Sequence, residues 1–185
     1  MDSRKIIDVT KRWIAEIVIG LNLCPFARRV FDSHLIRFTA TETIDEIDLL
    51  DILQSELRLL AAASRSEIET SILIHPFALT DFHNYNDFLG EADKVLSRWD
   101  LGGKIQIAGF HPQYQFEGIG PDAVENFTNR SPYPMLHLLR EASITEVADD
   151  PDVLLGIPDR NVAVMRKLGR EWMNAKLAGS RSPRE

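Results

Sequence analysis

The start of the chain carries apolar side chains at three- and four-residue spacing, which predicts an amphipathic helix packing one face on a core. Its stripe consists of Ile6, Val9, Trp13, Ile14, Ile17, Val18 and Leu21. We expect the helix to end near residues 20–22, because Pro25 disfavours the helical conformation for the residue before it. Cys24 is therefore expected in a turn just past the helix.

Two elements are predicted between residues 35 and 62. Residues 35–39 alternate apolar and polar side chains, which indicates a strand near a sheet edge. Thr43 and Glu46 have the spacing of a capping box at the start of a second helix. The apolar stripe of that helix is Ile47, Leu50, Leu53, Leu57 and Leu60, and its acidic residues are Asp45, Asp48, Asp51 and Glu56. Most of these acidic residues fall opposite the stripe, which indicates a solvated face and not a metal site.

The middle of the chain predicts a strand, a helix and a second strand. Residues 70–74 are short, β-branched and soon followed by Pro76, as in a buried strand. Asp81 can cap a helix with a wide apolar stripe that reaches Trp99. After a Gly-Gly break, residues 104–110 form another strand pattern. This order predicts a βαβ unit whose two strands run parallel through a right-handed crossover.

The remainder of the chain is expected to be a long loop and two helices. Residues 112–130 are irregular, at a length where a loop is often functional. Ser131 and Pro132 suit the start of a helix that continues through residue 141. A polar stretch at 149–152 then leads to a last helix over 158–176. We expect residues 1–178 to form a single α/β domain and residues 179–185 to be a frayed tail.

These elements predict an α/β fold with a small mixed or mostly parallel sheet. The sheet contains a central βαβ unit and is flanked by amphipathic helices, with a ferredoxin-like α+β sandwich as the main alternative.

Composition narrows the function classes. The chain has 185 residues, of which 44% are hydrophobic and 26% charged, as in ordinary globular proteins. Its net charge of −7 argues against a nucleic-acid partner. No apolar run is long enough to span a bilayer, so we expect no membrane partner. The single cysteine allows no internal disulfide, and with no secretory signal pattern at the start we expect a cytoplasmic protein.

His75 and His111 stand at equivalent positions, each at the end of a predicted parallel strand and each followed by proline. Open α/β sheets bind ligands at the carboxyl ends of their strands. If the two strands are adjacent, about 5 Å apart, one metal ion or one substrate could contact both rings. The alternative for each is a hydrogen-bonded loop histidine.

Cys24 is the third candidate for chemistry. Arg28 and Arg29 follow it closely and could lower the pKa of its thiol, as a cysteine nucleophile requires. The alternative is a small buried apolar residue between Leu23 and Phe26.

A polar segment after the long loop suggests an anion site. Asn129, Arg130 and Ser131 would stand at a predicted helix N-terminus, where free N–H groups favour an anion. Tyr114 could line the same pocket, and Arg28 is a further candidate for anion binding. His137 falls one turn into the predicted helix and is expected to be a core or surface residue. The alternative for Arg130 is a solvated side chain beside a capping turn.

No P-loop, GxGxxG, HExxH or GxSxG motif occurs, so the chemistries that depend on those motifs lack support. Several longer stretches resemble the family called domain of unknown function 1415, over residues 10 to 170. They are residues 20–27 (GLNLCPFA), 74–76 (IHP), 110–116 (FHPQYQF), 128–141 (TNRSPYPMLHLLRE) and 157–161 (IPDRN). The resemblance implies a bacterial-type cytoplasmic protein and supplies no reaction, cofactor or catalytic residue.

Two functional hypotheses remain. The first is an enzyme acting on a small anionic metabolite, with Cys24, His75 and His111 as its catalytic residues. Those three side chains would bind zinc or iron for metal-assisted hydrolysis or lyase chemistry, or Cys24 would act as a nucleophile with a histidine base. The alternative is a non-catalytic ligand-binding or adaptor protein.

Overall fold

Four strands form one mixed sheet in the order β1-β2-β4-β3. The computed structural model describes residues 2–147 and 151–181. The strands are β1 (Ile36–Ala40), β2 (Thr70–Ile74), β3 (Ile105–Phe110) and β4 (Met135–Arg140). β1 is parallel to β2, whereas β4 is antiparallel to both of its neighbours, β2 and β3. β2 and β3 therefore run in the same direction with β4 between them.

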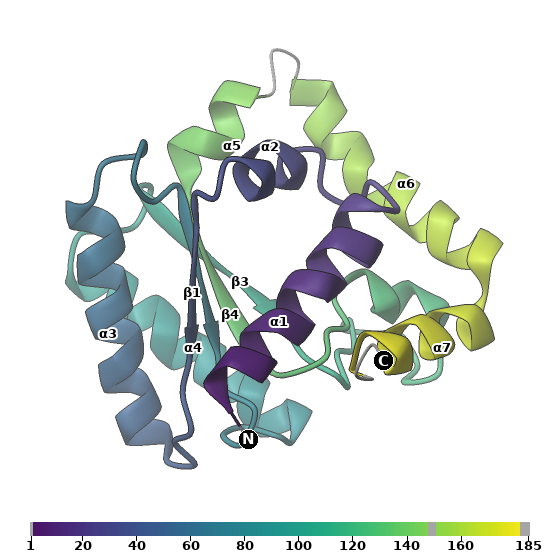
Figure 1. Cartoon of the computed structure of the whole chain (residues 1–185), viewed down its shortest axis with the longest axis horizontal. Coiled ribbons are helices and arrows are strands. Elements are labelled where there is room, and N and C mark those ends of the chain that lie inside the picture. The colour runs from purple at the N-terminus through teal and green to yellow at the C-terminus, as the bar shows by residue number, and fades with distance from the viewer. Residues whose placement is uncertain (1, 148–150, 182–185) are drawn as a thin grey trace.

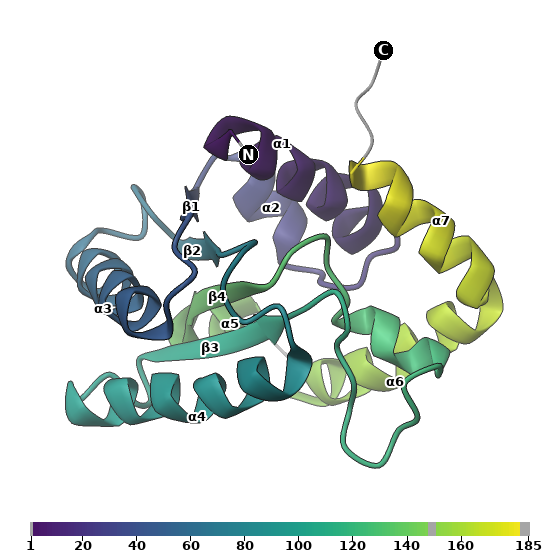
Figure 2. The same cartoon turned by 90° about the horizontal axis from the view of Figure 1, so that it is seen from below.

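Two helices cover one face of the sheet (Figures 1 and 2). α3 (Glu46–Ala62) connects β1 to β2, and α4 (Phe82–Arg98) connects β2 to β3. Both connections move across the sheet in the same direction, so crossovers of one hand place both helices on one face. Their apolar stripes pack on Leu73, Leu136 and Leu138.

The other face carries the N- and C-terminal helices. α1 (Ser3–Trp13) continues into the π-helical turn η1 (Ile14–Ile19), and α2 (Ala27–Asp32) follows. The remaining helices are η2 (Val124–Thr128), α5 (Glu141–Val147), α6 (Pro151–Leu168) and α7 (Arg170–Arg181). A second core joins β2 and β4 to α1, η1, Met165 and Met173. None of the described helices is long and apolar enough to cross a bilayer.

The structure confirms the mixed α/β fold, the β1 edge position and the Asp81 cap, whose carboxylate accepts from the His83 and Asn84 amides. The second helix is capped by Asp45, not by Thr43, because the Asp45 carboxylate accepts from the amides of residues 47 and 48. The expected last helix is two helices separated by Gly169, whose φ of 80° is left-handed. α7 runs through the first part of the expected tail, whereas residues 182–185 and part of the 149–152 stretch lie outside the described residues.

The helix predicted over residues 131–141 is wrong, because residues 135–140 form β4 and the helix begins only at Glu141. An isolated apolar run of this length fits a buried strand or a buried helix equally well. Here β4 is covered on both faces, and its neighbours supply hydrogen-bond partners along both of its edges. Tertiary pairing therefore decides the conformation.

Glu56 is an exception on the acidic helix, since it is only 5% exposed. Burial by itself raises the pKa of this carboxyl, but hydrogen bonds from Arg37 and Ser71 outweigh that effect and hold the pKa below its usual range. The Arg37 guanidinium contacts both carboxylate oxygens, at 2.9 and 3.0 Å. The pair joins α3 to β1, and the hydrogen bond from Ser71 joins α3 to β2.

The contact between α4 and β3 depends on Gly109. A Cβ at this position would lie 2.8 Å from the Tyr85 hydroxyl oxygen and 3.1 Å from Leu89 Cδ1. We predict that Gly109→Ala destabilises the protein by about 1–3 kcal/mol, as overpacking does. Urea unfolding followed by circular dichroism measures this change.

Gly90→Ala is the control, because Gly90 lies on α4, the helix that Gly109 packs against, with nothing within 4 Å of its added Cβ. Alanine favours helix over glycine, so this variant should be more stable by about 0.5–1 kcal/mol. Equal stability of Gly109→Ala and the wild type would contradict the packing described here.

Candidate functional site

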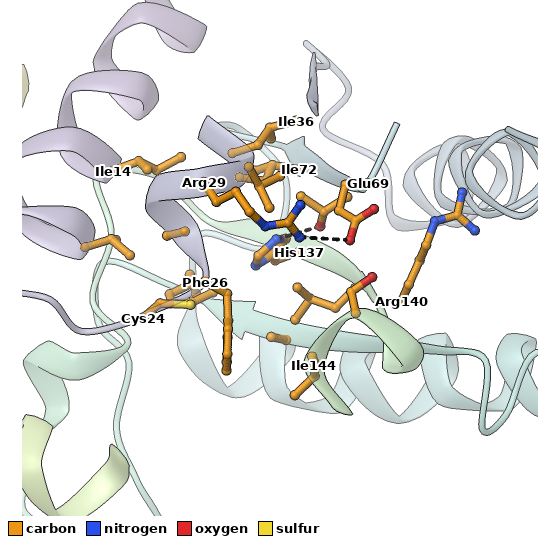
Figure 3. A pocket seen from close by; sticks show the side chains of 18 of the residues that line it. Ile14, Cys24, Phe26, Arg29, Ile36, Glu69, Ile72, His137, Arg140 and Ile144 are labelled. Atoms are coloured by element: carbon orange, nitrogen blue, oxygen red, sulfur yellow. Dashed lines mark hydrogen bonds and ion pairs between the residues drawn. The ribbon is translucent and has the colours of Figure 1, made fainter. Parts of the chain in front are cut away.

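A cavity of about 260 Å³ lies against the sheet face that carries α1 and α2 (Figure 3). Its floor comes from all four strands, and its walls come from α1, η1, α2 and α5. Most of the lining is apolar: Trp13, Ile14, Val18, Phe26, Ala27, Val30, Ile36, Ile72, Ala108, Phe110, Met135, Leu139 and Ile144. The polar lining residues are Cys24, Arg29, Glu69, Thr70, His137, Arg140 and Ser143. A largely apolar cavity with a few polar groups is the usual form of a small-molecule site.

Unpaired hydrogen-bond donors gather at this cavity. Four buried side-chain nitrogen or oxygen atoms in the described part of the chain lack a partner, and three of them belong to lining residues. These three are Trp13 Nε1, Arg140 Nε and Ser143 Oγ. Ser143 lies close enough to Glu69 to help lower the pKa of that carboxyl, without a hydrogen bond of normal geometry. A buried unpaired donor costs about 1–3 kcal/mol, so such a cluster calls for an explanation.

One end of the cavity is positively charged. Glu69 is 4% exposed, and its carboxylate accepts two hydrogen bonds from Arg65, at 2.9 and 3.1 Å. The pKa of Glu69 is lowered, first by the Arg65 hydrogen bond. Arg29 lies 3.6 Å away and is largely exposed, and Arg140 lies close enough to interact electrostatically. Of the charged residues at this end, Arg29, Arg140 and Glu69 line the cavity and together carry a formal charge of +1. The Arg140 guanidinium is already bonded through Nη2 to three backbone carbonyls.

His137 presents an unprotonated nitrogen to the cavity. The Thr70 hydroxyl lies 2.6 Å from the Leu138 carbonyl oxygen, which can only accept, and 2.8 Å from His137 Nε2. Because Thr70 has one proton and donates it to that carbonyl, Nε2 must donate to Thr70 and Nδ1 carries a lone pair. Nδ1 has no partner among the described residues and is not sealed from solvent. Burial lowers the pKa of His137 to about 4, so the ring is neutral at pH 7.

Cys24 lines the same cavity, as expected for a turn between η1 and α2. Asn161 of α6 holds this turn by donating to the Leu23 carbonyl at 2.8 Å, and Arg160 donates to the Asn22 carbonyl. Burial raises the pKa of the thiol despite the backbone amides of Phe26 and Ala27, which act in the opposite direction. The thiol form therefore predominates at neutral pH. The lowered thiol pKa that was expected of a Cys24 nucleophile is not found.

His75 and His111 lie on the opposite face, beside α4. Their rings contact Tyr85, at centroid distances of 5.9 and 5.0 Å, and both are fully buried. His75 Nδ1 lies 3.1 Å from the Ala78 oxygen and His111 Nε2 lies 3.2 Å from the Leu79 oxygen, so each donates to the turn after β2. That turn includes Leu79 in a left-handed conformation with φ of 54°. The two histidines therefore fix this turn.

The strands that carry the two histidines are not adjacent, because β4 separates β2 from β3 by two strand spacings, about 10 Å, although the two rings lie close enough for their charges to interact. Cys24 lines a cavity on the other side of the sheet. In the described part of the chain, no three His, Cys, Asp or Glu side chains are grouped as ligands of one metal ion would be. The expected zinc or iron set of His75, His111 and Cys24 is therefore not assembled.

The residues expected to bind an anion instead donate hydrogen bonds to backbone carbonyls in and around the long loop. Arg130 donates to the Tyr114 carbonyl at 3.2 Å and to the Pro121 carbonyl at 2.6 Å, and it stacks over Phe127. Asn129 donates to the Gly109 carbonyl, and the Ser131 hydroxyl donates to the Tyr133 carbonyl.

The helix N-terminus expected at Ser131 does not exist, since β4 follows. The Tyr114 ring packs against Phe82 and Phe116. Arg28 is exposed and does not line the cavity, whereas its neighbour Arg29 does.

Several lining residues were not recognised from the sequence as parts of a site, including Trp13, Glu69, Thr70, Arg140 and Ser143. His137 was placed on a helix. The usable signal was the pair Pro132 and Pro134, because a residue that precedes proline favours extended backbone. A strand beginning after Pro134 would have put Met135, His137 and Leu139 on one face.

His75 makes stability depend on pH. Burial lowers its pKa to about 4 in the folded protein, below the ordinary value of about 6.5, so the unfolded chain binds the proton more tightly. The contribution of neutral His75 to the free energy of unfolding is complete above pH 6.5 and is lost as the pH falls from about 6.5 to about 4. His75→Asn keeps a donor for Ala78 and cannot titrate. We predict that its melting temperature is lower than that of the wild type at pH 7 but falls less steeply towards pH 4.5.

His83→Asn, at an exposed position of α4, is the control and should keep the wild-type pH profile. Parallel profiles for His75→Asn and the wild type would show that His75 is not held neutral by burial.

Comparison with known proteins identifies relatives of this chain. Residues 5–175 match the family described as "Protein of unknown function (DUF1415)". Searches of curated proteins and of solved structures gave no match. The family match spans the sheet, the helices of both faces and every described residue that lines the cavity. The chain therefore belongs to the DUF1415 family.

Proposed function

We propose that this protein binds a small, mainly apolar molecule carrying an acidic group, in the cavity between the sheet and α1, α2 and α5. The observation that carries the proposal is the guanidinium-rich end of an otherwise apolar lining, where Arg29 and Arg140 accompany a Glu69 carboxylate that already accepts two hydrogen bonds from Arg65. A carboxylate offers acceptors only, so it can pair with such donors without leaving a donor of its own unpaired.

Charge supports an anion in preference to a cation. The two arginines that line this end, Arg29 and Arg140, outnumber Glu69, whose oxygens are already paired with Arg65 outside the lining. Arg29 is the most adaptable of them, because it is largely exposed and its distance of 3.6 Å from Glu69 exceeds that of a hydrogen bond. It can turn towards a ligand without leaving Glu69 unpaired.

Cavity size limits the ligand. A cavity of about 150 Å³ is enough for benzene, so 260 Å³ suits a molecule of about 10–15 non-hydrogen atoms. A single ring or branched chain with a short acidic arm meets this limit. Larger cofactors such as dinucleotides exceed it.

Binding without transformation is better supported than cysteine or metal chemistry. A thiolate nucleophile requires a lowered thiol pKa, whereas burial raises that of Cys24. A metal-assisted reaction requires ligands grouped around one point, and the described residues offer no group of three. We propose that the protein acts in the cytoplasm, where its single thiol would stay reduced.

Hydrocinnamate, an aromatic acid of suitable size, tests the proposal against its neutral isostere hydrocinnamide. Isothermal titration calorimetry should show saturable binding of the acid and at least about tenfold weaker binding of the amide, because the amide lacks charge for the arginine end. Arg29→Gln should weaken binding of the acid about threefold to fivefold, in keeping with an exposed cation.

Arg28→Gln is the matched control, since Arg28 is the adjacent arginine and does not line the cavity. Its affinity for hydrocinnamate should equal that of the wild type. Equal binding of acid and amide, or equal losses in the two arginine variants, would refute the anion end of the cavity.

A further inference from the structure

The cavity contains one open acceptor as well as its donors. His137 Nε2 donates to the Thr70 hydroxyl, and that hydroxyl donates to the Leu138 carbonyl. The lone pair on Nδ1 is therefore left to accept a hydrogen bond from a ligand. A carboxylate cannot satisfy this nitrogen, because it has no proton to donate at neutral pH. The ligand that fits the whole cavity therefore carries a hydrogen-bond donor in addition to its acid group.

The acceptor and the positive end lie close together. Glu69 and Thr70 are consecutive residues at the start of β2. Glu69 lies 3.6 Å from Arg29, and Thr70 lies 2.8 Å from the His137 ring. Figure 3 shows the His137 ring next to the Arg29–Glu69 pair, with Cys24 and Phe26 on the other side of the ring. A ligand that contacts both therefore carries its acid group and its donor at the same end of the molecule.

The donor must also be uncharged. An ammonium group would lose its hydration in a cavity whose lining is mostly apolar, and the nearby arginines would repel it. A hydroxyl group avoids both costs and pairs with a neutral imidazole. The burial that lowers the pKa of His137 keeps the ring neutral and its Nδ1 lone pair available at pH 7.

We infer that the ligand is an α-hydroxy acid with an aromatic or branched aliphatic side chain, whose hydroxyl donates to His137 Nδ1. This inference rests on the proposed function. The carboxylate pairs with the donors at the arginine end, and the side chain fills the apolar space lined by Phe26, Ile72 and Met135. His137 determines specificity by direct contact, and Thr70 is a positioning residue that fixes the proton on Nε2.

Phenyllactate and hydrocinnamate form the test pair, because they differ only in the α-hydroxyl. Calorimetry at pH 7.5 should give about tenfold tighter binding of phenyllactate to the wild type, the worth of one hydrogen bond to a buried acceptor. His137→Phe keeps a ring without nitrogen and should lose the preference, so that it binds the two acids with equal affinity. Circular dichroism checks that the variant is folded.

Thr70 variants give a second, independent measurement. Thr70→Val removes the hydroxyl that fixes the tautomer and should reduce the preference for phenyllactate. Thr70→Ser retains a hydroxyl and should keep that preference. Nitrogen NMR of the His137 ring should show the Nε2–H tautomer in the wild type and in Thr70→Ser but not in Thr70→Val. A purely structural role for Thr70 would leave the tautomer unchanged.

The outcomes separate the two proposals. Failure of both acids to bind the wild type would overturn the proposed function together with the inference. Equal binding of both acids to the wild type would overturn the inference and leave the acid site standing. A preference for phenyllactate that persists in His137→Phe would overturn the role of His137.

Discussion

The structure depends on the pairing of β4 with both of its neighbours. The crossover from β2 through α4 to β3 leaves a gap one strand wide, with backbone groups on both sides that require partners. β4 fills this gap and satisfies both edges. The pairing continues beyond the strands, since the His75 amide donates to the Pro134 carbonyl and the His111 amide donates to the Asn129 carbonyl. The segment after the long loop is therefore fixed to both halves of the crossover.

The alternation of side chains along the strands then separates two kinds of histidine. His75 and His111 follow the last residues of β2 and β3 and turn towards α4, where their N–H groups hold the turn at residues 78–79. His137 lies in the middle of β4, opposite Ile72 and Ala108, and faces the cavity. All three pKa values are lowered by burial, and His75 Nε2 also lacks a partner, but of the three rings only that of His137 lines the cavity. A perturbed pKa identifies a functional residue only together with that geometry.

Local patterns predicted most of the fold, because helix stripes, the Asp81 cap and the β-branched run of β2 are short-range signals. The strand order was not predictable, since it depends on β4, whose sequence also suits a helix. The error at β4 then carried over to the site. Because a helix was predicted to start at Ser131, Asn129 and Arg130 were predicted to bind an anion at its N-terminus. For the same reason His137 was not predicted to lie on a strand facing a cavity. The cavity itself required tertiary information, because its polar lining comes from three stretches far apart in the sequence, residues 24–29, 69–70 and 137–143. Only Cys24, among the expected catalytic residues, lies in it.

The methionines offer the most direct test of whether the cavity is the ligand site. Of the four in the chain, Met135 lines the cavity, whereas Met165 and Met173 are buried in the same core without lining it. NMR of isotope-labelled methionine methyl groups, assigned with single Met→Leu variants, reports on each position separately. Titration with phenyllactate should shift the Met135 resonance saturably and leave those of Met165 and Met173 in place. An unchanged Met135 resonance at ligand concentrations that saturate binding would contradict the account, because the acid would then be bound elsewhere.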